Sequence, residues 1–148
     1  MRYFYASFLL AALVTALPAE TVDVRRDGEG VHAVDVHLYD GSLRIEGSET
    51  GEFRAEGTLG GDSGFLDVER SRAGFIVRVR RDQRPGTPSA DISLQVPSGT
   101  RLHVEGGDAD VDISGVHGAA TVRTRRGDIN LEYERGNHVD ISTVSGQV

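Results

Sequence analysis

Residues 101–148 have the sequence RLHVEGGDADVDISGVHGAATVRTRRGDINLEYERGNHVDISTVSGQV, and this stretch decides the fold. A glycine, a polar residue and then apolar residues at every second position recur from Gly107, Gly127 and Gly146, which lie 20 and then 19 residues apart. A fixed period with two-residue alternation inside it is typical of a β-solenoid, in which each repeat forms one coil stacked on the last. The sequence therefore predicts parallel β-strands with about 20 residues per coil.

The segments that precede these glycines recur at the same spacing. Leu102, Val122 and Ile141 fall at equivalent places in successive repeats, again 20 and 19 residues apart. Glycine supplies 19 of the 148 residues, and the glycines are spaced between short alternating runs, as at turns and coil corners. No segment after residue 20 shows a helical period of 3.6 residues, so an all-β chain is predicted.

The N-terminus is typical of a secretory signal peptide. Residues 1–19 carry one positive charge at Arg2, an uncharged run and small residues before a cleavage site that we expect after Ala19. A retained membrane anchor is the alternative, because the uncharged run approaches the length that spans a bilayer. The chain has no cysteine, so an exported form must be stable without disulfides. Its net charge of −7 argues against nucleic acid as a partner.

Residues 20–148 are expected to form a single domain. An irregular N-terminal β part at 20–90, with an antiparallel hairpin section, precedes regular coils at 91–148. The elements expected in the first part are a hairpin or two adjacent strands at 21–24 and 31–38, an early coil beginning at Gly41, a strand at 52–58, a hairpin at 65–80 and a proline-containing loop at 81–90.

Motifs in the second part add a family resemblance. An alternating strand is followed by a Val-Pro-Ser-Gly turn at 96–99, Leu-x-Val at 102–104, and Thr-x-x-Gly at 124–127 and 143–146. In this order they resemble the bacterial putative-adhesin domain of β-strand-repeat envelope proteins, over roughly residues 34–148. The resemblance implies a right-handed β-solenoid, export to the cell envelope and no established catalytic residues. Members of that family usually continue through more coils, whereas this chain stops at Val148.

Four carboxylates are weak candidates for a calcium site. Asp108, Asp110 and Asp112 alternate with apolar residues, so they share the outward face of one strand, and Asp128 falls at a matching position in the next coil. Side chains two residues apart on a strand are almost 7 Å apart, so one ion would need ligands from several coils. We therefore interpret the row as a solvated acidic face, and no metal or other cofactor is predicted.

Two clusters of arginines are the candidate binding face. They contain Arg78, Arg80, Arg81 and Arg84 in one segment, and Arg123, Arg125 and Arg126 in another. Arginine can hold phosphate or carboxylate on a lipid head group or a cell-wall polymer. The alternative, which we favour, is ion pairing with the acidic face. Arg78, Arg80, Arg123 and Arg125 remain the residues to examine for binding.

The serine-containing motif at 61–64 and the histidines do not indicate a catalytic site. The Gly-Asp-Ser-Gly at 61–64 is similar to the nucleophile segment of trypsin-like proteases, but nothing else in the chain supplies that fold, so we expect a turn. The five histidines have no spacing typical of metal ligands.

The sequence therefore predicts an exported, non-catalytic envelope or surface protein, an adhesin-like structural or binding module located in the periplasm, on the outer surface or in the medium. Its partner would be an envelope component or a protein. An open C-terminal coil also favours self-association, because unpaired strand edges tend to pair. Two alternatives are an envelope-stress signalling partner and a carbohydrate-active β-helix enzyme with paired carboxylates.

Overall fold

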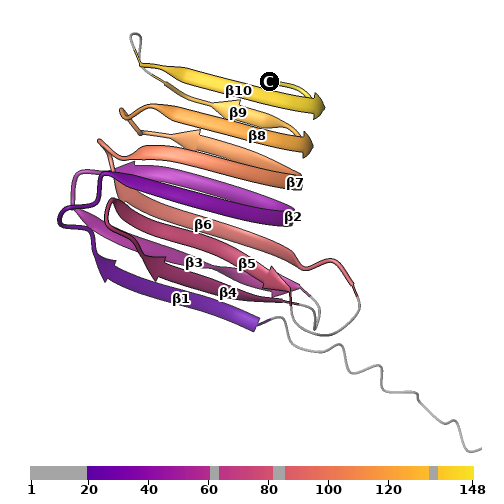
Figure 1. Cartoon of the computed structure of the whole chain (residues 1–148), viewed down its shortest axis with the longest axis horizontal. Helices are drawn as coiled ribbons and strands as arrows, with labels where there is room; N and C mark the ends of the chain where they lie inside the picture. The colour runs from indigo at the N-terminus through magenta and orange to yellow at the C-terminus, as the bar shows by residue number, and fades with distance from the viewer. Residues whose placement is uncertain (1–19, 61–63, 82–85, 134–136) are drawn as a thin grey trace, which may run out of the picture.

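The computed structural model describes residues 20–60, 64–81, 86–133 and 137–148, and confirms an all-β chain (Figure 1). Its strands are β1 (Glu20–Asp27), β2 (Ala33–Ser48), β3 (Glu52–Gly60), β4 (Gly64–Arg70), β5 (Gly74–Arg81), β6 (Ser89–Pro97), β7 (Arg101–Ser114), β8 (Ala120–Arg126), β9 (Ile129–Leu131) and β10 (Val139–Ser145). They form one large mixed sheet in which most pairings are parallel. Within these residues no helix has the length and apolar character needed to cross a membrane.

The sheet folds over into two layers because its two longest strands change partners along their length. Residues 33–37 of β2 pair with β5, whereas residues 40–48 pair with β6. In the same way, the first half of β7 pairs with β8 and the second half with β9. The first layer therefore contains β4, β5, the first halves of β2 and β7, β8 and β10. The second layer contains β1, β3, β6, the second halves of β2 and β7, and β9.

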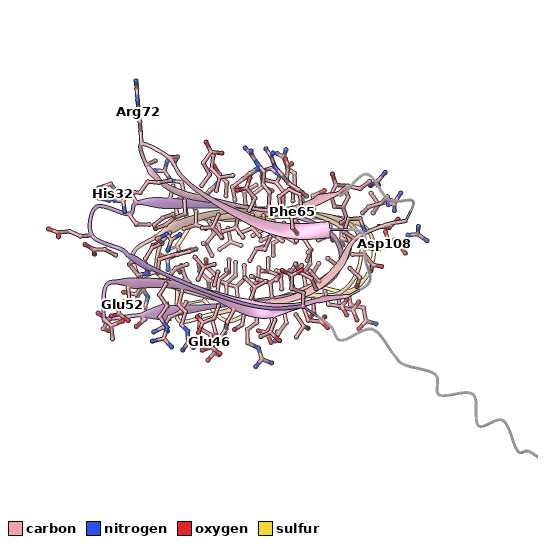
Figure 2. The ribbon with its side chains drawn as sticks, turned by 90° about the horizontal axis from the view of Figure 1, so that it is seen from below. His32, Glu46, Glu52, Phe65, Arg72 and Asp108 are labelled. Atoms are coloured by element: carbon pink, nitrogen blue, oxygen red, sulfur yellow. The ribbon has the colours of Figure 1, made fainter. Side chains whose placement is uncertain are left out.

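The core fills the space between the two layers, as Figure 2 shows. Alternate side chains of each strand point into it, for example Val34 in the first layer and Ile45 in the second, both fully buried. Burying one such aliphatic side chain contributes roughly 1.5–3 kcal/mol. Near one end of the molecule Phe53 of β3 stacks on Phe75 of β5 with ring centroids 4.3 Å apart, and this contact joins the two layers.

The spacing of the repeats differs from the prediction. In the first layer Val104 pairs with Val122, which is 18 residues later, and Val122 pairs with Ile141, which is 19 residues later. The predicted equivalence of Leu102 with Val122 is therefore wrong by two residues. A shift of two residues keeps the same side chains inward, so the alternating pattern by itself does not distinguish the two registers.

The N-terminal strands take part in the stack. β2 lies between β6 and β7 and is hydrogen-bonded to both, so the segment from Gly41, predicted as an early coil, forms a strand within the parallel part of the sheet (Figure 1). The predicted pairing of 21–24 with 31–38 is wrong, because β1 pairs antiparallel with β3. The hairpin at 65–80 is confirmed as β4 and β5.

Some predicted features lie outside the described residues. These are the signal peptide at 1–19, most of the Gly-Asp-Ser-Gly segment at 61–64, and Arg84 within the proline-containing loop.

Candidate functional site

The four candidate arginines lie on the outer face of one layer. Arg78 and Arg80 alternate with the buried valines of β5, and Arg123 and Arg125 alternate with buried residues of β8. Both strands belong to the first layer, with the first halves of β2 and β7 between them. At the usual strand spacing the two arginine pairs are about 14 Å apart. Two clusters that are remote in sequence thus share one surface.

Ion pairs hold three of these arginines: Arg78 and Arg80 pair with carboxylates of β4, and Arg125 pairs with Asp108 of the acidic row. The Nε atom of Arg80 lies 3.1 Å from Asp67, and Arg78 lies 3.8 Å from Glu69, both on the neighbouring strand β4. Arg123 makes no ion pair within the described part of the chain. Such exposed pairs contribute about 0–1 kcal/mol each, so an anionic ligand can replace the protein carboxylates at little cost.

Asp108 occupies the bend of β7, where it binds two arginines. Arg125 donates to its Oδ1 at 2.9 Å, and Arg126 lies 3.2 Å from its Oδ2. The hydrogen bond from Arg125, reinforced by the charge of Arg126, holds the pKa of Asp108 below its ordinary value. This candidate calcium ligand is therefore part of the arginine face.

The other calcium candidates lie on the outer face of the second layer. Asp110 Oδ1 accepts a hydrogen bond from the backbone N–H of Asp128 at 2.8 Å, and Asp128 Oδ1 accepts one from Gln147 at 2.9 Å. These bonds link one strand to the next. In the described ranges no group of three or more histidine, aspartate or glutamate side chains is placed to hold a metal ion.

A groove of about 510 Å³ runs over this second face. It is lined by Ser42, Leu43, Arg44, Glu56, Gly57, Asp91, Ile92, Ser93, Asp110, Val111, Asp112, Asp128 and Asn130. Its polar groups are mainly carboxylates, hydroxyls and one amide, with Arg44 among them.

Two histidines and a glutamate form a cluster that sequence reasoning missed. Glu105 lies between His37 Nδ1 and His103 Nε2, at 3.2 Å from each. The hydrogen bond to His103, together with the proximity of His37, holds the pKa of Glu105 below its ordinary value. Because His37 and Glu105 are brought together only by the pairing of β2 with β7, no local sequence signal reveals the cluster.

A second groove, of about 470 Å³, opens on the first layer beside this cluster. It is lined by His37, Leu38, Tyr39, Arg78, Val79, Arg80, Glu105, Gly106 and Gly107. Arg81 lies over the Tyr39 ring, 5.4 Å from its centroid. The groove thus combines the β5 arginine pair with an aromatic side chain, a combination that suits an anionic ligand with an apolar part.

Comparison with solved structures finds a similar fold in bacterial proteins described as putative adhesins. The structure is similar to a putative cell adhesion protein from Clostridium sporogenes, with a TM-score of 0.61 and 12% sequence identity, over 85% of this chain and 68% of that one. It also matches a putative adhesin from Bacteroides fragilis, with a TM-score of 0.39 and 11% identity, over 86% and 78% of the two chains. No family model and no curated protein matches the sequence. The resemblance inferred from the sequence motifs is confirmed at the level of structure.

Proposed function

We propose that this protein is an exported, non-catalytic binding module of the adhesin type, built as a right-handed solenoid, which holds an anionic component of the cell envelope. The observation that carries the proposal is the convergence of Arg78, Arg80, Arg123 and Arg125 on one outer face. The likeness of the fold to a putative cell adhesion protein supports the same class of function. The signal-peptide pattern at residues 1–19 supports export.

The mechanism follows from the rigidity of the layer. Each arginine projects from a strand that is hydrogen-bonded on both sides, so the spacing between the arginine pairs is fixed before a ligand arrives. Preorganised groups lose little conformational entropy on binding. Carboxylate or phosphate groups repeated along a polymer can occupy both arginine pairs at once, and linked contacts raise the overall affinity.

A binding experiment on the full chain tests the proposal. Polygalacturonate and polyphosphate serve as anionic probes, and binding is measured by calorimetry at low and high salt. The double variants Arg78→Gln/Arg80→Gln and Arg123→Gln/Arg125→Gln should each weaken binding about tenfold, since each removes charge-assisted hydrogen bonds. Arg44→Gln is the matched control, because Arg44 is exposed on the second layer and makes no ion pair within the described residues.

Two results would contradict the proposal. Absence of binding to every polyanion would remove its basis, and an equal loss in Arg44→Gln would show that general charge, not the first layer, is responsible.

The carboxylate-lined groove of the second layer keeps an enzyme as the alternative. Saturable turnover of a polysaccharide that Asp110→Asn abolishes would establish that alternative. The proposal expects no turnover, because Asp110 and Asp128 accept hydrogen bonds from neighbouring backbone N–H groups.

A further inference from the structure

One row of side chains crosses the first layer at right angles to its strands. Its register follows from the pairings of adjacent strands, and the positions of the row lie at or just beyond these pairs: Phe65 with Arg80, His37 with Arg78, Leu38 with Gly106, Gly106 with Thr124, and Thr143 with Thr124. We call it the mixed row, and it consists of Phe65 (β4), Arg80 (β5), Tyr39 (β2), Gly107 (β7), Arg125 (β8) and Val144 (β10).

Exposed apolar side chains are concentrated in the mixed row. Of the four large apolar side chains exposed in the described ranges, three belong to it: Phe65 (46% exposed), Tyr39 (44%) and Val144 (83%). Apolar residues scattered singly over a surface need no explanation, but a group of them marks a binding site. Here they alternate with two arginines, so the row offers apolar and cationic groups in turn.

The row also contains a gap. Gly107 has no side chain, and a Cβ there would collide with the carbonyl oxygen of Tyr39. The 470 Å³ groove opens at this gap, with Tyr39 and Arg80 along its wall. The Tyr39 ring is held in place by Arg81, and Phe65 lies directly opposite Arg80 on the next strand. The aromatic ring of Tyr39 and the guanidinium group of Arg80 therefore border a depression that can receive part of a ligand.

We propose that the mixed row binds a linear acidic polysaccharide whose sugar units carry carboxylates, with the polymer lying across the strands. This inference rests on the proposed function and names its ligand class. A sugar ring presents an apolar C–H face, which packs on an aromatic side chain, and each uronate carboxylate matches the two parallel N–H groups of an arginine. The alternation of Phe65, Arg80 and Tyr39 offers both contacts in turn.

Other anionic partners fit the mixed row less well. Polyphosphate has no apolar face, so it would use the arginines and leave the aromatic side chains without a role. An acidic peptide binds a sheet best by adding a strand, but the inner strands of this layer already use their backbone groups in pairing with both neighbours.

The test compares the affinity of the full chain for four probes: polygalacturonate, polyphosphate, polyglutamate and neutral dextran. Phe65→Ala and Tyr39→Ala should each weaken polygalacturonate binding about fivefold and leave polyphosphate binding unchanged, because only the sugar polymer packs on an aromatic ring. Arg80→Gln should weaken binding of both polyanions about tenfold. Val148→Ala is the matched control, since Val148 is an exposed large apolar residue outside the row. Melting curves confirm that each variant is folded.

The outcomes separate this inference from the proposed function. The inference is wrong if Phe65→Ala and Tyr39→Ala bind polygalacturonate with normal affinity, or if their affinity for polyphosphate falls by the same factor. In either case, weaker binding of the polyanions by Arg80→Gln still supports the proposed function. Tighter binding of polyglutamate with the same dependence on Phe65 and Tyr39 would assign the row to an acidic protein segment and also overturn the inference. Failure of every polyanion to bind would overturn both.

Discussion

Replacing the glycine at the bend of β2 should destabilise the whole protein. Gly41 has φ of +119°, where side chains are strained, and it lies where β2 passes from the first layer to the second. A Cβ at this position would collide with the carbonyl oxygen of Ala90 on β6. Two other glycines allow the cost of the positive φ to be measured apart from the cost of the collision. Gly30 has positive φ of +74° but open space around it, and Gly99 has open space without positive φ.

The magnitudes follow from adding the separate contributions. An alanine in the left-handed region costs about 1–2 kcal/mol, and alanine restricts the unfolded chain, which returns about 0.4–1 kcal/mol. Gly30→Ala should therefore cost about 1 kcal/mol in free energy of unfolding, and Gly99→Ala should gain about 0.5 kcal/mol. Gly41→Ala must in addition displace the neighbouring backbone. This displacement is comparable to overpacking a core, which costs roughly 1–3 kcal/mol. The total loss in free energy of unfolding should therefore be about 3 kcal/mol.

Urea denaturation of the three variants, followed by far-ultraviolet circular dichroism, measures these differences directly. A loss of 3 kcal/mol is a large part of the stability of a single domain, which is about 5–15 kcal/mol. If Gly41→Ala unfolds at the same urea concentration as Gly99→Ala, the conclusion that β2 bends from one layer to the other at Gly41 is wrong.

Two further predictions concern single side chains. Thr124 is buried and its hydroxyl has no hydrogen-bond partner within the described residues. Thr124→Val should therefore raise the free energy of unfolding by about 1 kcal/mol. A urea midpoint lower than that of the unchanged protein would show that the hydroxyl is paired. For Asp108, the bond from Arg125 lowers the pKa in the folded state below the ordinary 3.8, so its stabilisation is complete above pH 3.8 and is lost as the pH falls through the lowered value. The melting temperature of Asp108→Asn should thus fall below that of the unchanged protein at pH 7 and approach it below pH 3.8, whereas a difference that does not vary with pH would contradict this assignment.

The alternating pattern predicted which side chains are buried, because each strand has one face against the core. In the strand predicted at 52–58, two-residue alternation places Phe53 and Ala55 on one face, and both are fully buried. The outward direction of Arg123 and Arg125 follows in the same way from the buried Val122. These predictions depend only on the alternation of inward and outward side chains along a strand, which the sequence shows directly.

The register and order of the strands depend on contacts that the local pattern does not contain. Gly107 was expected to be equivalent to Gly127, but in the structure Gly127 lies against the backbone of Ala109. The sequence also gives no sign that β2 inserts between β6 and β7, which are consecutive in the chain. This insertion brings His37 beside Glu105 and Tyr39 beside Gly107, so the histidine cluster and the mixed row exist only in the folded sheet.

The sequence does contain a signal for the mixed row, but it can be recognised only once it is known which alternate positions of each strand point into the core. Phe65 and Tyr39 are apolar residues at outward positions, each adjacent to a leucine on the same strand, Leu66 and Leu38. Two consecutive apolar residues normally suggest a strand buried on both faces. Since the first layer faces the core on one side only, its outward aromatic side chains are not required for packing. Their exposure in line with two arginines is therefore more simply explained by a ligand than by the fold.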